Sequence, residues 1–165
     1  MTPLYIFDLD GTLALIEHRL HYVADGRKNW DSFQAAFHAA CVDDVPNAPV
    51  IGVLNALRKA GAECWIWSGR DDSVLVQTVE WLQRNGCFGS PRSVLWAWPF
   101  MAVDRFRMRP HGDHQLDVTL KRGWLHAMAP ADRARLQAVF DDRSRLVKMW
   151  REEGVPCFQV AEGDF

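Results

Sequence analysis

The chain has 165 residues and a formal net charge of −2, and 48% of its residues are hydrophobic. That length fits one ordinary domain, and the apolar content is ample for a core. A nearly balanced charge argues against a protein that coats nucleic acid with a broad basic surface, but it permits an enzyme that holds one or two phosphates through a few local cations. The apolar runs are all far shorter than the roughly 20 residues of a membrane-spanning helix, so we expect no membrane partner.

The four cysteines show neither a C-x-x-C pair nor the spacing of zinc ligands. Cys64 and Cys157 lie inside apolar, strand-like runs, where a free cysteine is usually a small buried apolar side chain. We therefore expect a reducing, cytoplasmic setting.

Short apolar runs alternate with amphipathic segments along the chain. We expect strands over residues 4–7, 62–67, 94–98, 138–140 and 157–160. We expect helices over residues 48–60, 73–85, 117–128 and 144–153, with Asn47 and Asp72 capping the first two. This alternation is typical of βαβ units, so the sequence predicts an α/β fold of three layers with a central, mainly parallel sheet between helices.

Two long stretches interrupt the alternation. Residues 15–46 include a helical piece over residues 30–41, and we expect them to form a small helical cap inserted into a single domain of residues 1–165. Residues 100–116 read as an arginine-rich loop, in which Arg105, Arg107 and Arg109 either follow a nucleic-acid backbone or simply lie in solvent. Long loops in a compact domain are more often lids or binding loops than spare chain.

Asp8, Asp10, Gly11 and Thr12 form a D-x-D-G-T pattern directly after the first predicted strand. Such a pair of carboxylates can present one side chain and one backbone carbonyl to the same cation, and hard oxygen ligands of this kind suit Mg²⁺. A carboxylate such as Asp8 can also attack phosphorus directly. Gly11 permits the sharp turn that brings Asp10 back over the site. The competing interpretation is an ordinary surface turn, since Asp-Gly is common turn chemistry.

A second polar cluster follows the second predicted strand. Ser68, Gly69 and Arg70 offer a hydroxyl, a backbone amide and a guanidinium, which are the donors that suit a phosphate group. Alone this pattern is weak, because Ser-Gly after a strand is usually an ordinary loop. Ligands of parallel sheets bind at the carboxyl ends of the strands, so we expect this cluster to lie beside the first.

Lys121 lies in the predicted helix 117–128, and Asp141 and Asp142 follow the next apolar strand. An ammonium group can offset a crowd of carboxylates and phosphate, although a lone lysine on a helix is usually a surface residue. Two adjacent carboxylates repel each other unless a cation or a basic partner lies beside them. A helix cap would explain one of the two aspartates but not easily both.

In this order, the four clusters resemble the four signatures of the haloacid dehalogenase (HAD) phosphohydrolases, and the resemblance spans the chain. It implies a Rossmann-like HAD fold and a Mg²⁺-dependent phosphatase that forms an aspartyl-phosphate on Asp8. It also implies that Asp10 protonates the leaving oxygen and then activates water. An aspartate at position 10 favours a phosphatase over the dehalogenase branch, because a phosphoester needs that acid and base.

A narrower resemblance lies in two segments. The run MRPHGDHQLDVTLK has Arg109, Asp117 and Lys121 at spacings similar to those of phage polynucleotide kinase/3′-phosphatase proteins. The segment DDRSRLVKMWREEGVPCFQVAEGDF resembles the end of those proteins nearly residue for residue. This likeness implies removal of a 3′-terminal phosphate from DNA or RNA. Because the G-x-x-x-x-G-K-S/T loop of their kinase domain is missing here, we expect a stand-alone phosphatase without 5′-kinase activity, acting beside a separate kinase or ligase.

The resemblances also imply the residues of the site. The implied catalytic residues are Asp8, Asp10 and Lys121. The implied phosphate-binding residues are Thr12, Ser68, Gly69, Arg70, Arg109 and Lys121. The implied Mg²⁺ ligands are Asp8, Asp141, Asp142 and the carbonyl group of Asp10.

The sequence leaves two other functions open. A HAD phosphatase with the same residues could act on a small phosphorylated metabolite such as a nucleotide or a sugar phosphate. A non-catalytic HAD-fold module that binds a partner is less well supported, because holding four aspartates together without Mg²⁺ would cost stability.

Overall fold

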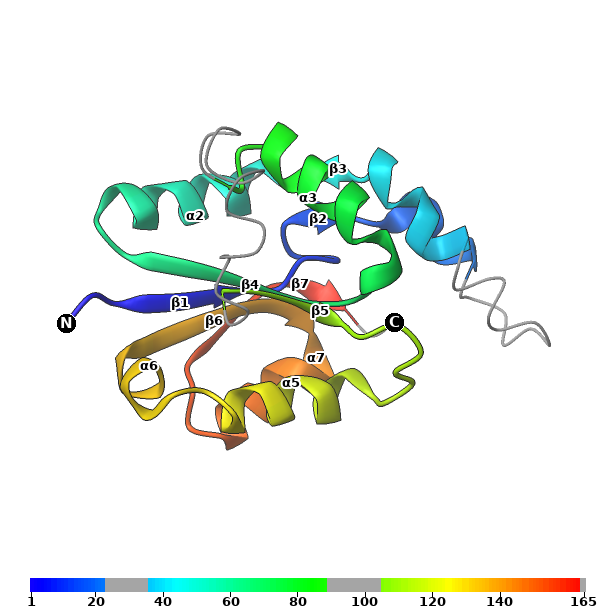
Figure 1. Ribbon diagram of the computed structural model, residues 1–165. Coiled ribbons are helices and arrows are strands. Elements are labelled where there is room, and N and C mark those ends of the chain that lie inside the picture. Colours follow the sequence, from blue (N-terminus) through cyan, green and yellow to red (C-terminus); the bar gives the residue numbers. More distant parts are fainter. Residues whose placement is uncertain (23–35, 89–104, 164–165) are drawn as a thin grey trace.

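The computed structural model describes residues 1–22, 36–88 and 105–163. Its centre is a five-stranded sheet with the strand order β5-β4-β1-β6-β7, and every neighbouring pair is parallel (Figure 1). The strands are β1 (Leu4–Phe7), β4 (Glu63–Asp71), β5 (Phe106–Arg109), β6 (Leu136–Arg143) and β7 (Cys157–Gly163). The predicted central, parallel sheet is therefore confirmed.

Helices cover both faces of this sheet. One face carries α2 (Ala48–Lys59) and α3 (Leu75–Arg84) (Figure 1). The other carries α5 (Asp117–His126), α6 (Pro130–Arg135) and α7 (Ser144–Glu152). The three predicted layers are thus present. Among the described residues, no helix is long and apolar enough to cross a membrane.

Alternation along the strands divides the core into two clusters, because successive side chains of a strand point to opposite faces of the sheet. Ile6 and Trp67 face α7, where they pack with the buried Trp150. Phe7 and Ile66 face the opposite helices. Cys64 and Cys157 are buried, as predicted, and all four cysteines are free thiols.

The strands extend further than the sequence predicts, and one was missed. β4 continues to Asp71 and β6 to Arg143, so the polar clusters lie within the strand ends rather than in turns after them. The predicted loop over residues 100–116 contains the edge strand β5, whose only apolar residues are Phe106 and Met108, too few to give a strand signal. The predicted strand over residues 94–98 lies outside the described residues.

The two predicted helix caps differ from the structure. Asn47 occupies the N-cap position of α2, but its side-chain amide donates to the carbonyl oxygen of Thr12 at 2.9 Å. Before α3, a 3₁₀ turn spans Asp72–Val74, and Asp71 rather than Asp72 accepts a hydrogen bond from the Ser73 amide. The Asp72 carboxylate instead accepts a hydrogen bond from the backbone amide of His111.

Both ends of the predicted cap segment are tied together. β2 (Ala14–Leu15) pairs antiparallel with β3 (Val45–Pro46). Between them lie the 3₁₀ helices η1 (Glu17–Tyr22) and η2 (Ala40–Asp43). Residues 36–39 are helical, which agrees with part of the predicted helix over 30–41, and residues 30–35 lie outside the described part.

Candidate active site

The parallel strands bring the predicted polar clusters to one edge of the sheet. Asp8 directly follows β1, and its backbone amide donates to the carbonyl oxygen of Phe140 in β6 at 2.9 Å. Asp141 and Asp142 end the same region of β6, and Lys121 reaches the site from α5. The structure therefore brings Asp8, Lys121, Asp141 and Asp142 together at this edge of the sheet, as expected.

A buried lysine joins two of the aspartates. The Nζ atom of Lys121 lies 2.6 Å from Oδ1 of Asp8 and 3.0 Å from Oδ2 of Asp141. Burial alone would lower the pKa of Lys121, but the charges of Asp141 and Asp8 outweigh it and hold that pKa well above its usual range. Lys121 is therefore an ammonium ion, and the alternative of a solvated surface lysine is wrong.

The carboxylates themselves are crowded. Burial raises the pKa of Asp8, and repulsion from Asp141 and Asp142 raises it further, against the lowering by Lys121. Burial and the neighbouring charge of Asp141 likewise raise the pKa of Asp142 to about 6. A buried cluster with this excess of negative charge favours a positive ligand.

The same three carboxylates form a donor set for a cation. One oxygen from each of Asp8, Asp141 and Asp142 lies within 4.8 Å of the others. Carboxylate oxygens at such separations suit a hard divalent ion such as Mg²⁺. The hydroxyl group of Thr12 donates to Oδ1 of Asp142 at 3.3 Å, so this predicted phosphate ligand touches the cluster.

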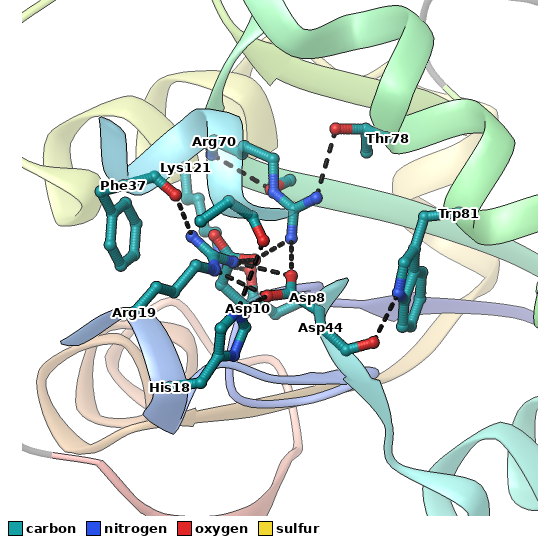
Figure 2. Close-up of polar contacts among 12 residues, drawn as sticks. Asp8, Asp10, His18, Arg19, Phe37, Asp44, Arg70, Thr78, Trp81 and Lys121 are labelled. Atoms are coloured by element: carbon teal, nitrogen blue, oxygen red, sulfur yellow. Dashed lines mark hydrogen bonds and ion pairs between the residues drawn. The ribbon is translucent and has the colours of Figure 1, made fainter. Parts of the chain in front are cut away.

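Asp10 is held by two arginines (Figure 2). Nη2 of Arg19 lies 2.6 Å from Oδ1 of Asp10, and Nη2 of Arg70 forms an ion pair with the same oxygen. Burial would raise the pKa of Asp10, but the two guanidinium groups outweigh it and keep that pKa well below its usual range. Asp10 is therefore ionised in this structure.

A second buried carboxylate, Asp44, braces both arginines. Its Oδ1 accepts from Nε of Arg19 at 2.7 Å, and its Oδ2 accepts from Nη2 of Arg19 at 2.9 Å and from Nη2 of Arg70 at 2.7 Å. The indole of Trp81 donates to the Asp44 carbonyl oxygen at 2.8 Å and fixes the backbone there (Figure 2). Asp10, Asp44 and the two arginines form one network, which we call the buried ion-pair network.

Sequence reasoning missed Arg19 and Asp44. Both lie in the segment predicted to be a cap, 25 residues apart, and no spacing motif connects them. No sequence signal could have found them, because it is the pairing of β2 with β3 that brings this segment over Asp10. Arg70 was predicted to bind phosphate; here its guanidinium contacts Asp10, Asp44 and Thr78, and the phosphate role stays a prediction.

Arg109 is also engaged by the protein. It donates to the carbonyl oxygens of Gly69, Asp113 and Gln115 at 2.7–3.1 Å and forms an ion pair with Asp117. These contacts join β5 to α5 beside the site. Arg109 faces the pocket described below, and its predicted contact with substrate phosphate remains a prediction.

The second cluster sits at the end of β4. The buried Ser68 hydroxyl accepts a hydrogen bond from the backbone amide of Arg70 at 3.1 Å. Gly69 lines the pocket, and a methyl group at this position would lie 2.8 Å from a carboxylate oxygen of Asp117. A larger residue here would therefore have to displace the Asp117 carboxylate, and glycine keeps the backbone close to the pocket.

These groups open onto a pocket of about 700 Å³. Its lining includes Asp8, Asp10 and Lys121. The side formed by the cap segment contributes Leu20 and Phe37. The rest of the lining is mostly polar and includes Asp113, His114, Gln115, Asp117, Arg143 and Arg145 beside Leu116 and Leu146. This volume lies near the middle of the range for small-molecule sites, so it exceeds the needs of a phosphate group alone.

Comparison with known proteins agrees with this geometry. The profile of the family described as "Polynucleotide kinase PNKP phosphatase domain" matches residues 2–165. Two solved chains, from "Structure of the Pnkp1/Rnl/Hen1 RNA repair complex" and "Structure of Pnkp1/Rnl/Hen1 complex", are 27% and 26% identical to this chain, each with a TM-score of 0.72. Each match covers 99% of this chain but only 44% and 48% of those chains, so this chain spans about half of their length.

A hydrolase from Streptococcus pneumoniae TIGR4 shares the fold, with a TM-score of 0.51 over 95% of this chain and 91% of that chain at 13% identity. The match to the family profile extends over nearly the whole chain, and Asp8, Asp141 and Asp142 lie within it. The chain therefore belongs to the HAD phosphatases of the polynucleotide kinase PNKP phosphatase-domain family, and it is a phosphoric monoester hydrolase.

Proposed function

We propose that this chain is a Mg²⁺-dependent phosphatase that removes the 3′-terminal phosphate from polynucleotides through an aspartyl-phosphate on Asp8. The observation that carries the proposal is the pairing of Asp8 with the buried Lys121 ammonium in the lining of the pocket, beside Asp141 and Asp142. Family membership supports the polynucleotide substrate.

In this proposal Asp8 has the role of nucleophile. Lys121 donates to Oδ1 of Asp8, which leaves the other carboxylate oxygen available to attack phosphorus. In the first step that oxygen forms a bond to phosphorus while the bond to the leaving 3′ oxygen breaks, and Asp10 gives its proton to the leaving oxygen. In the second step water attacks phosphorus, Asp10 takes a proton from the water, and inorganic phosphate and the Asp8 carboxylate are released.

The buried ion-pair network decides the resting form of Asp10. Arg19 and Arg70 keep the carboxylate ionised, which suits the base of the second step. The first step needs a proton on Asp10. A phosphomonoester with a second pKa of about 6 can supply it when it binds as the monoanion.

The residues that would hold Mg²⁺ are Asp8, Asp141 and Asp142, with the carbonyl group of Asp10 as the further predicted ligand. When bound, Mg²⁺ would neutralise charge on the phosphoryl oxygens. Lys121 lies between Asp8 and Asp141 and would contact the transferred phosphoryl group from the other side. The predicted contacts from Thr12, Ser68, Gly69, Arg70 and Arg109 complete the proposed phosphate site.

The pocket supports a substrate larger than a phosphate. Leu20 and Phe37 offer apolar surface, and Arg143 and Arg145, which both pair with Asp117, add positive charge to the lining. We propose that residues 15–46 form a small cap on a single domain of residues 1–165, which leaves room for a polymer end. The two similar chains belong to structures described as Pnkp1/Rnl/Hen1 complexes, which supports a partner such as a separate kinase or ligase. The four free cysteines support a cytoplasmic location.

The test compares kcat/KM for 3′-phosphorylated DNA and RNA oligonucleotides with kcat/KM for a panel of nucleotide and sugar phosphates, with Mg²⁺ and with EDTA. We expect the oligonucleotides to be preferred and EDTA to abolish turnover. A preference for a metabolite by orders of magnitude would instead identify a small-molecule phosphatase. Binding of the oligonucleotide without turnover under any condition would identify a non-catalytic module.

The covalent step has its own test. Asp8→Asn should abolish turnover, because an amide is not a nucleophile for phosphorus, and circular dichroism should show the fold intact. Acid quenching of the wild-type reaction with a radiolabelled phosphoryl group should leave label on the protein. Retained turnover in Asp8→Asn would exclude Asp8 as the nucleophile.

A further inference from the structure

We infer that Gln159 and Gly163 on the last strand, β7, are positioning residues for Asp142 and thereby set the affinity of the site for a divalent cation. The inference rests on the proposed function in one respect, since it takes Asp142 as a metal ligand. Neither residue belongs to the sequence clusters that carry the chemistry.

The pairing of β6 with β7 is interrupted at Asp142. Val139, Phe140 and Asp141 pair in turn with Cys157, Phe158 and Gln159, and the next pair is Arg143 with Gly163. Between these pairs one residue of β6, Asp142, lies opposite three residues of β7, so β7 bulges around the aspartate. Bulges of this kind often re-aim a side chain next to an active site.

Both ends of the bulge contact Asp142. At one end the side-chain amide of Gln159 donates to the carbonyl oxygen of Asp142 at 2.9 Å. At the other end Gly163 lies against the carboxylate, since a methyl group on Gly163 would be 2.6 Å from Oδ2 and 3.1 Å from the carbonyl oxygen of Asp142. The two ends of the bulge therefore contact both the backbone and the side chain of the buried Asp142.

Gly11 also lies against this carboxylate. A methyl group on Gly11 would lie 2.1 Å from Oδ2 of Asp142, so two glycines lie against the same carboxylate oxygen. The two glycines differ in one useful respect. Gly11 has a φ of 86°, which itself favours glycine, whereas Gly163 is not among the described glycines with positive φ. At Gly163 the close approach to Asp142 is thus the physical reason for glycine.

A methyl group at position 163 would push Asp142 off its place. Ordinary contact begins at 3.4 Å, so the 2.6 Å approach requires a displacement of about 0.8 Å. Thr12 already donates to the other oxygen of Asp142, which restricts a simple rotation of the carboxylate. Mg²⁺ tolerates little departure from its octahedral geometry, and changes to groups that orient metal ligands commonly lower metal affinity about 10- to 100-fold.

The experiment measures binding of Mn²⁺ alone to the full chain, by electron paramagnetic resonance of the free ion, for Gly163→Ala and for Gln159→Ala. Gly52→Ala and Gly123→Ala are matched controls, because a methyl group at either site meets nothing within 4 Å. We expect the Mn²⁺ Kd to rise about 10-fold or more for Gly163→Ala. We expect a smaller rise for Gln159→Ala and none for the controls.

Melting curves in EDTA separate positioning from folding. Gln159→Ala removes a hydrogen bond without adding bulk, so it remains informative if Gly163→Ala does not fold. An unchanged Mn²⁺ Kd in the folded variants, or a loss of melting temperature with no loss of Mn²⁺ affinity, would overturn the inference, as would a wild-type chain that binds no Mn²⁺. Because no substrate is used, a chain that binds Mn²⁺ but does not cleave 3′-phosphate would refute the proposed function and leave this inference standing.

Discussion

Replacing Asp44 by asparagine removes one charge from the buried ion-pair network while keeping the shape of the side chain. Asp44 accepts three hydrogen bonds from Arg19 and Arg70, two of them at Oδ2. An asparagine can keep its carbonyl oxygen at the Oδ2 position. Its NH₂ group then takes the place of Oδ1 and faces the N–H of Arg19 Nε, so two hydrogen-bond donors face each other. At least one charge-assisted bond is lost, and Asp10 alone must balance two buried guanidinium groups.

The expected cost follows from that count. Breaking a buried ion pair by removing one partner typically costs about 3–5 kcal/mol. A chain of this size loses about 2–4 °C of melting temperature per kcal/mol, so Asp44→Asn should lower Tm by roughly 6–20 °C. Activity should fall by about 100-fold, because Arg19 and Arg70 no longer hold Asp10 in place and a misplacement near 1 Å has about that effect.

The assay combines thermal unfolding with kcat/KM at a temperature where circular dichroism shows the variant folded. Asp43→Asn is the control, because Asp43 is the adjacent aspartate and is exposed. The loss should be larger for a 3′-phosphorylated oligonucleotide than for p-nitrophenyl phosphate, whose leaving group needs little help from an acid. An Asp44→Asn chain within twofold of wild type, with a Tm within about 2 °C, would refute the reasoning about the network.

Three further predictions concern the cation site and the pocket. Lys121→Met should abolish turnover and lower stability in EDTA, because Asp8 and Asp141 lose their shared ammonium group; unchanged melting in EDTA would contradict this. The rise in Tm caused by Mg²⁺ should be larger at pH 7.5 than at pH 5. The pKa of Asp142 in the folded chain, about 6, lies above its unfolded value, so the metal-free chain loses stability as the pH rises from the unfolded pKa to the folded pKa. Below about pH 6, Mg²⁺ must also displace the proton from Asp142. Equal Tm shifts at both pH values would show that Asp142 does not titrate there. Arg109→Ala should reduce kcat/KM for oligonucleotides more than for p-nitrophenyl phosphate; equal losses would limit Arg109 to bracing Gly69 and Asp117.

The chemistry-bearing residues could be predicted from sequence because each follows an apolar strand, and parallel strands must end at the same edge of the sheet. Asp8 and Asp141 come together for that reason, and Lys121 reaches both of them from α5. The same logic gives the three layers, since the strand and helix patterns are strong over Leu4–Phe7 and Leu75–Arg84.

The remaining features depend on contacts that no local pattern reveals. Arg19 and Asp44 meet only because β2 pairs with β3 and folds their segment over Asp10. β5 carries two arginines in four residues, so its strand character comes from pairing with β4 rather than from its own composition. The bulge of β7 around Asp142 arises where the pairing of β6 with β7 shifts register, and no residue pattern in β7 marks that point.

The unequal count of charges around Lys121 has a kinetic consequence. Asp8, Asp141 and Asp142 contribute three negative charges, and Lys121 contributes one positive charge. Two negative charges remain, which one divalent cation would balance. A phosphate dianion that entered first would meet this excess directly. We therefore expect compulsory order, with Mg²⁺ binding before substrate, so that raising Mg²⁺ lowers the apparent KM for the phosphate ester and inorganic phosphate inhibits only the metal-loaded enzyme.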